Sequence, residues 1–163
     1  AWPFEVDGNW PVEGGEAAQG NSGVVGAVSA GNGTIGYADL SQAGDLGIAR
    51  IRVGDEFVAP TAEAAAAVVE NSDPLEGRGP YDFAIEVDRA TEGSGEYPIV
   101  LISYHIGCMS YDDAATAELL RSFMSYVASE AGQEAAALVA GSAPISDALR
   151  DQALTAIDAV AAS

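Results

Sequence analysis

Residues 14–39, GGEAAQGNSGVVGAVSAGNGTIGYAD, carry the strongest structural pattern in the chain. The pattern predicts a glycine-rich loop, a short helix, a glycine turn and a buried strand. Asn21 or Ser22 is expected to cap the helix, because a short side-chain oxygen there can accept a bond from an unpaired backbone N–H. Val24 and Val28 then share one apolar face of that helix. A loop–helix–turn–strand unit of this kind is the repeating part of an α/β domain.

The turn and the strand follow from residue type. Residues 31–33, Gly-Asn-Gly, are expected to end the helix, because they tolerate positive φ. Residues 34–37, Thr-Ile-Gly-Tyr, have the β-branched and aromatic character of a strand. The same rules predict the remaining elements. They are strands at 48–53, 56–58, 83–87 and 97–107, a short helix or turn at 40–47, and helices at 62–70, 112–130, 133–140 and 145–161. Gly54-Asp55 is expected to join the first two of these strands as a hairpin, and residues 71–80 are expected to form a loop. Pro60-Thr61 and Asp112 or Asp113 are expected to cap the helices that follow them, and Gly132 is expected to break the longest helix.

The charge of the chain restricts its partners. Six arginines are its basic residues, and they face 25 acidic residues for a net charge of −19. Nucleic acid and anionic membrane surfaces are therefore excluded as expected partners, since binding them depends on neutralising phosphates with Lys and Arg. The acidic residues are interpreted as a solvated surface. A calcium-binding protein is the alternative, but the sequence has no loop of the D-x-[DN]-x-[DN]-G type.

The sequence predicts no catalytic residue, no metal site and no cofactor. Cys108 is the one cysteine, which excludes an internal disulfide, and it is expected to be a buried, inert thiol. His105 is the one histidine, and no G-x-S-x-G motif accompanies it. Pairs of neighbouring carboxylates are common on so acidic a surface, and no phosphate-binding Walker motif is present.

The remaining candidate is an anion site that needs no basic side chain. A helix N-terminus presents unpaired N–H groups and a partial positive charge, and so can hold an oxyanion. The predicted helix start at residues 20–23 makes Asn21, Ser22 and Gly23 the candidate ligand-binding residues. Glycine lets a ligand approach the backbone, and the Ser22 hydroxyl adds a donor. The alternative is that Asn21 and Ser22 only cap the helix.

A family resemblance rests on the same stretch. A helix opening on G-N-x-G, followed by G-x-I-G-Y and an acidic residue, resembles the second lobe of periplasmic-type phosphate-binding proteins. Those proteins are the solute receptors of high-affinity phosphate ABC transporters. Three further pieces agree in order and spacing. They are Trp10-Pro11, the sequence YPI at residues 97–99, and APISDAL at residues 143–149.

The resemblance implies an α/β fold, namely the second lobe of a type II periplasmic-binding-protein fold with C-terminal helices packed on it. Residues 1–107 would form that lobe, with the strand at 97–107 returning towards the hinge, and residues 108–163 would form the helices. The first lobe and a Ser-Gly-Thr helix start with a nearby Arg are expected upstream of Ala1. The main phosphate contacts are expected there as well.

The resemblance also implies a function and a location. The protein would be a receptor, not an enzyme, that delivers inorganic phosphate to the permease subunits of an ABC transporter. Its partners would be phosphate, the permease and the N-terminal lobe of the same protein. It would work outside the cytoplasm as a lipoprotein, held by a lipid anchor in its N-terminal part. Two alternatives are a receptor for another oxyanion or an enzyme on the same fold, and an interaction module that no longer binds a ligand.

Overall fold

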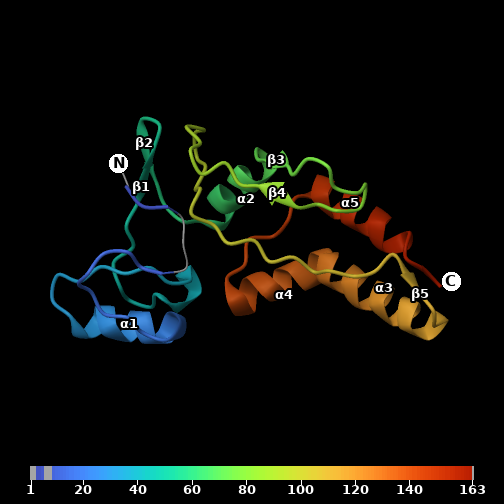
Figure 1. The fold of residues 1–163 in the computed structure, drawn as a ribbon, viewed down its shortest axis with the longest axis horizontal. Helices are drawn as coiled ribbons and strands as arrows, with labels where there is room; N and C mark the ends of the chain where they lie inside the picture. The colour runs from blue at the N-terminus through green and yellow to red at the C-terminus, as the bar shows by residue number, and fades with distance from the viewer. Residues whose placement is uncertain (1–2, 6–8, 163) are drawn as a thin grey trace. The chain divides into compact units, whose positions relative to one another are not determined.

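The computed structural model describes residues 3–5 and 9–162. The chain forms two compact units, Ala1–Gly47 and Ile48–Ser163 (Figure 1). The described residues make a mixed α/β structure with five α-helices and three two-stranded sheets. In this part of the chain no helix is long and apolar enough to cross a membrane.

The first unit contains helix α1, Gly20–Ala30, and the short 3-10 helix η1, Leu40–Gln42. Both predicted elements are confirmed. Gly31 follows α1 in an extended conformation, with its N–H donating to the Ala27 carbonyl. Gly33 then takes a φ of 71°, a conformation that favours glycine. The Gly-Asn-Gly turn therefore ends the helix as expected.

The buried strand predicted at residues 34–37 is wrong. The segment forms no strand, and the side chains of Ile35 and Tyr37 are 88% and 85% exposed. β-branched and aromatic residues favour a strand only when cross-strand neighbours cover them. In the described part of the first unit no strand pairs with this segment. Its apolar side chains consequently face solvent.

The second unit begins with a β-hairpin and a helix. Strands β1, Ile51–Val53, and β2, Glu56–Val58, pair antiparallel, and Gly54 begins the two-residue turn with a φ of 55°. Helix α2, Ala62–Glu70, starts at Thr61, whose hydroxyl oxygen accepts a hydrogen bond from the Ala64 N–H. The hairpin, the turn and the helix confirm the sequence predictions. The hydrophobic cluster that joins them consists of Val53, Val58 and Ala64, with Ile51 and Tyr97 packed against it.

A second, shorter pair of strands follows. β3, Asp73–Pro74, pairs antiparallel with β4, Ile85–Glu86. β4 lies within the strand predicted at 83–87, so the position of that strand is confirmed. β3 falls in a segment predicted as a loop from its Gly and Pro content. Proline is tolerated there because a strand at the edge of a sheet can lack one donor.

Three helices make up the C-terminal part. They are α3, Ala114–Ala128, α4, Glu130–Ala140, and α5, Asp147–Asp158. α3 packs against both α4 and α5, and a parallel pair of short strands, β5, Ser110–Tyr111, and β6, Ala161–Ala162, joins the start of α3 to the end of the chain. The buried apolar residues of this part are Ala117, Ala128, Ala156, Ile157 and Val160.

The boundary between α3 and α4 lies at Ser129, so the prediction that Gly132 breaks the helix is wrong. Ser129 has a ψ of 157° and serves both as C-cap of α3 and as N-cap of α4. Its hydroxyl donates to the Tyr126 carbonyl at 2.6 Å and accepts from the Gly132 N–H at 3.1 Å. Gly132 is buried in the first turn of α4, where a Cβ atom would lie 2.0 Å from the Tyr126 carbonyl oxygen.

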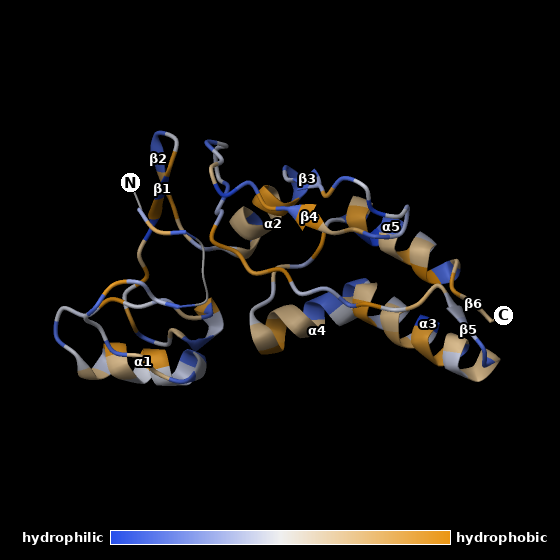
Figure 2. Cartoon of the chain, viewed as in Figure 1, coloured by the Kyte–Doolittle hydropathy of each residue, from blue (hydrophilic) through white to orange (hydrophobic). Residues whose placement is uncertain are grey.

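The strand predicted at residues 97–107 is also wrong. This apolar segment, seen in Figure 2 between β4 and β5, forms no strand, and Leu101 and Ile106 are more than nine-tenths exposed. The Arg89 guanidinium donates to the Pro98 and Val100 carbonyls. A side chain, and not a neighbouring strand, therefore holds the first part of the segment. Cys108, at its end, is exposed, so the expectation of a buried thiol is wrong as well.

Candidate functional site

The start of α1 offers the candidate anion site. The N-cap residue is Gln19, and no side chain caps the helix. No acidic residue lies in the first turn either. The first backbone N–H groups of a helix have no acceptor inside the helix, and they carry the positive end of its dipole. The helix start can therefore donate hydrogen bonds to an oxyanion.

The structure brings Asn21, Ser22 and Gly23 together on this first turn. Asn21 and Ser22 are exposed, and Gly23 is half-buried beside Ala18, whose Cβ atom lies 3.3 Å from the position a Cβ would take on Gly23. The prediction that Asn21 or Ser22 caps the helix is wrong, because both lie inside the helix and not at the N-cap. A capping residue has an extended backbone and stands directly before the helix. In α1 that residue is Gln19.

Asn21 has a different role. Its Oδ1 atom accepts a hydrogen bond from the backbone N–H of Asp39 at 3.0 Å. The Asp39 carboxylate in turn accepts from the Ser41 N–H at 2.9 Å and from the Ser41 hydroxyl at 2.6 Å, which caps η1. Asp39 therefore connects the start of α1 to η1. Sequence reasoning assigned Asp39 no contact, although the acidic residue after G-x-I-G-Y was a signal of it.

The glycine of the G-x-I-G-Y motif packs on the apolar face of α1. A Cβ atom on Gly36 would lie 2.8 Å from a Val28 methyl group and 3.1 Å from a Val24 methyl group. The Thr34 hydroxyl donates to the Val28 carbonyl at 2.8 Å. Because Gly36 lacks a side chain, the segment can approach the helix closely. These motif residues thus hold the segment after α1 in place.

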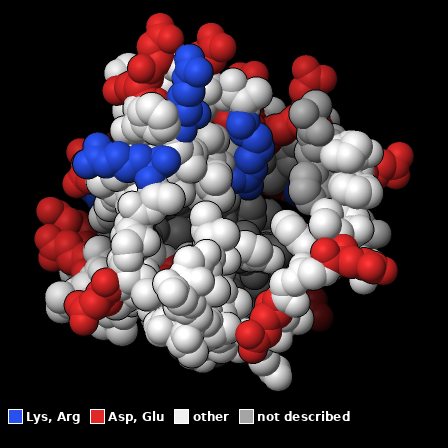
Figure 3. Space-filling view, turned by 90° about the vertical axis from the view of Figure 1, so that its left-hand side faces the viewer, with Lys and Arg blue, Asp and Glu red and all other residues white. Residues whose placement is uncertain are grey.

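The charge around the helix start is unfavourable to tight anion binding. Residues 1–47 contain no Lys, Arg or His, so all six arginines belong to the second unit. Figure 3 shows, on one face of the molecule, that acidic side chains are spread widely and arginines are few. Within the first unit, a phosphate at α1 would therefore be held by backbone N–H groups and hydroxyls. Further contacts are needed for a receptor of high affinity.

The geometry of the described residues does not add support for a metal site or a catalytic site. Among the described residues no group of three or more His, Cys, Asp and Glu side chains could hold a metal ion. The His105 ring packs edge-on against the Phe123 ring at a centroid distance of 6.1 Å. Its surroundings are those of an exposed packing contact.

Comparison with known proteins supports the resemblance in part. The chain is 31% identical over 153 residues to the phosphate-binding proteins PstS 3 and PstS 2 of Mycobacterium tuberculosis (strain ATCC 25618 / H37Rv). It is equally similar to PstS3 of Mycobacterium bovis (strain BCG / Pasteur 1173P2). Each match covers 90% of this chain and 40% of the relative.

The chain thus spans about 40% of the length of the curated relatives it matches. No protein-family model matches it. No solved structure matches it either. The similarity to phosphate-binding proteins is therefore distant, but it runs through nearly the whole of this chain.

Proposed function

We propose that this chain is the C-terminal portion of an extracytoplasmic phosphate receptor that delivers inorganic phosphate to the permease of an ABC transporter. The observation that carries the proposal is the 31% identity to phosphate-binding proteins over 90% of the chain. Residues 1–107 would belong to the second lobe and residues 108–163 to the C-terminal helices. A lipid anchor would lie in the N-terminal part of the complete protein.

In this proposal the ligand is held between two lobes that close around it. The Ser22 backbone N–H and hydroxyl would add secondary contacts at the start of α1, where Gly23 lets the ligand approach the backbone. The principal contacts would come from the first lobe and from a Ser-Gly-Thr helix start upstream of Ala1. Fixed dipoles at short range can outweigh the surface charge of −19, because exposed charges are screened within about 10 Å at 0.1 M salt.

Two segments with exposed apolar side chains support the presence of further protein around this chain. Residues 34–37 and 97–107 have the composition of strands but lack strand partners in the described structure. Such segments present exposed apolar side chains, for example Ile35 and Leu101, that favour packing against another part of a protein. The first lobe of the same receptor is the partner that we propose for them.

Calorimetric titration of the complete protein with phosphate tests the function. We expect a Kd on the order of micromolar or tighter, which corresponds to about 8 kcal/mol of binding free energy, and no comparable heat with sulfate. Absence of binding by the folded, complete protein would refute the receptor function. Comparable or tighter binding of sulfate would instead identify a receptor for another oxyanion.

The 163-residue chain by itself gives a second test. We expect no tight phosphate binding, because one lobe and the principal contacts would be missing. Sequencing the gene upstream of Ala1 should show a Ser-Gly-Thr helix start with a nearby Arg. Tight binding by the isolated chain would show that the site is placed wrongly.

A further inference from the structure

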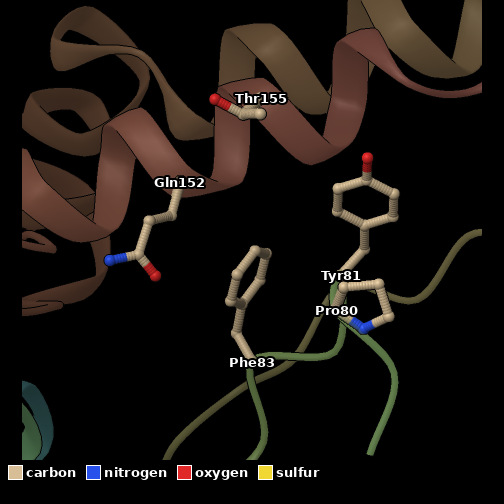
Figure 4. Close-up of a pocket in the computed structure, with 5 residues that line it drawn as sticks. All are labelled: Pro80, Tyr81, Phe83, Gln152 and Thr155. Atoms are coloured by element: carbon tan, nitrogen blue, oxygen red, sulfur yellow. The ribbon is translucent and has the colours of Figure 1, made fainter.

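A small pocket lies between α5 and the segment that leads into β4, and both belong to the second unit (Figure 4). Its volume is about 180 Å³. The residues that line it are Pro80, Tyr81, Phe83, Gln152 and Thr155. The Tyr81 and Phe83 rings stand side by side facing α5, and the Gln152 side chain extends from the helix into the same space.

The size of the pocket limits what it can hold. Sites for drug-sized ligands have volumes of roughly 300–1,000 Å³, and this pocket is smaller. The space is enough for the end of one long side chain. The pocket therefore suits a single residue of a partner.

The lining combines aromatic faces with oxygen acceptors. Tyr81 is 43% exposed, so the pocket is open to a partner. The Thr155 hydroxyl donates to the Asp151 carbonyl at 2.8 Å, which leaves its oxygen lone pairs as acceptors. Gln152 adds an amide oxygen. A ligand that is cationic, planar and rich in N–H donors satisfies both kinds of group.

Two carboxylates share a face of α5 with Thr155, which lines the pocket. Asp151 and Asp158 are exposed and lie at i−4 and i+3 from Thr155, so they share its helix face. Among the described residues, the ion pairs of this region join Arg78 to Asp82 at 2.7 Å and Arg150 to Asp147 at 2.6 Å. Neither pair engages Asp151 or Asp158. The face of α5 that carries Thr155 is thus acidic, and none of the residues that line the pocket is basic.

We propose that this pocket binds an arginine side chain of a protein partner. The guanidinium stacks on the Tyr81 and Phe83 rings, its N–H groups donate to the Gln152 and Thr155 oxygens, and Asp151 and Asp158 supply opposite charge. The chain carries 25 acidic residues against six arginines, so charge complementarity favours a basic partner. This contact is independent of phosphate binding.

NMR titration of the 163-residue chain tests the proposal with N-acetyl-arginine amide as the probe. The matched control is N-acetyl-citrulline amide, which has nearly the same shape but no charge. We expect saturable shifts of the Tyr81 and Phe83 ring signals and a Kd roughly two to five times lower for the arginine probe, the range expected of an exposed cation–π contact. Equal affinity for the two probes would overturn the proposal.

Variants locate the contact. Phe83→Leu and the double variant Asp151→Asn/Asp158→Asn should each weaken arginine binding at least twofold. Phe57→Leu, which removes another exposed ring, should leave it unchanged. An equal loss in Phe57→Leu would overturn the assignment. Backbone amide spectra check the fold of each variant, and the comparison of the two probes on the unaltered chain needs no variant.

Two further outcomes would identify another occupant. Ring signals of Tyr81 and Phe83 that shift on dilution of the protein alone would assign the pocket to a second copy of the chain. Free arginine that binds more than tenfold tighter than the blocked probe would indicate an amino-acid ligand. Either result contradicts a protein partner.

Discussion

The Oδ1 atom of Asn21 accepts a hydrogen bond from the backbone N–H of Asp39 at 3.0 Å, across 18 residues of chain. This bond occupies the side-chain oxygen that was expected to cap α1. It ties the start of α1, which has no side-chain cap, to the segment that leads into η1. Of the three candidate residues, Ser22 is therefore the one whose side chain we propose as a ligand contact.

The substitution Ser22→Ala in the complete receptor should weaken phosphate binding by roughly two- to tenfold, which is the effect of one net hydrogen bond. Ser29→Ala, at the other end of the same helix, is the matched control and should change nothing. Calorimetric titration measures both. A loss above a hundredfold would place a principal contact at Ser22, and no loss would remove Ser22 from the site.

The substitution Gly132→Ala should lower the free energy of unfolding by about 1–3 kcal/mol, the usual effect of overpacking. Its Cβ atom would lie 2.0 Å from the Tyr126 carbonyl oxygen, so the junction of α3 and α4 would have to shift. Gly26→Ala is the opposite case, because a Cβ there meets nothing within 4 Å inside α1. It should raise stability by about 0.5–1 kcal/mol. Urea unfolding of both variants checks the difference in sign.

The substitution Glu96→Ala should destabilise the protein by about 1–3 kcal/mol, because it removes two side-chain hydrogen bonds to a carboxylate. The Glu96 side chain is buried and accepts from the Asn71 amide at 2.5 Å and from the Thr91 hydroxyl. Glu92→Ala removes an exposed carboxylate from the same loop and should change stability by less than about 0.5 kcal/mol. Similar unfolding midpoints for the two variants would show that the Glu96 contacts contribute no stability.

The Asp113 cap should make α3 sensitive to acid. The hydroxyl of Thr116, then the backbone N–H groups of Thr116 and Ala115, lower the pKa of the Asp113 carboxyl from its ordinary value of 3.8. Since the folded state has the lower pKa, this stabilisation is fully present above the unfolded pKa. It is lost as the pH falls through the folded pKa.

Asp113→Asn keeps a capping oxygen but cannot titrate. Between pH 6 and pH 3 it should lose less stability than the unaltered protein, as measured by urea unfolding. Glu118→Gln removes an exposed carboxylate from the middle of α3 and serves as the control. An Asp113→Asn variant with the same pH dependence as the unaltered chain would contradict the role of the cap.

Elements that depend on neighbouring residues were predictable. The hairpin turn at Gly54, the start of α2 at Thr61 and the cap of α3 by Asp113 each involve groups within about four positions in the chain. The helix break at Ser129 was missed because helix-favouring residues continue on both sides of it. A backbone rotation at one residue leaves little trace in such a pattern.

The sequence by itself determined the local elements, the strongly acidic charge and the resemblance to phosphate-binding proteins, because each depends on residue type and short-range spacing. Only the tertiary structure decided that residues 34–37 and 97–107 form no strand, that Asn21 binds Asp39, and that Tyr81 and Phe83 face α5. The Asn21–Asp39 bond and the pocket join groups far apart in the chain. The physical reason is that a strand or a pocket exists only where distant residues supply its other side.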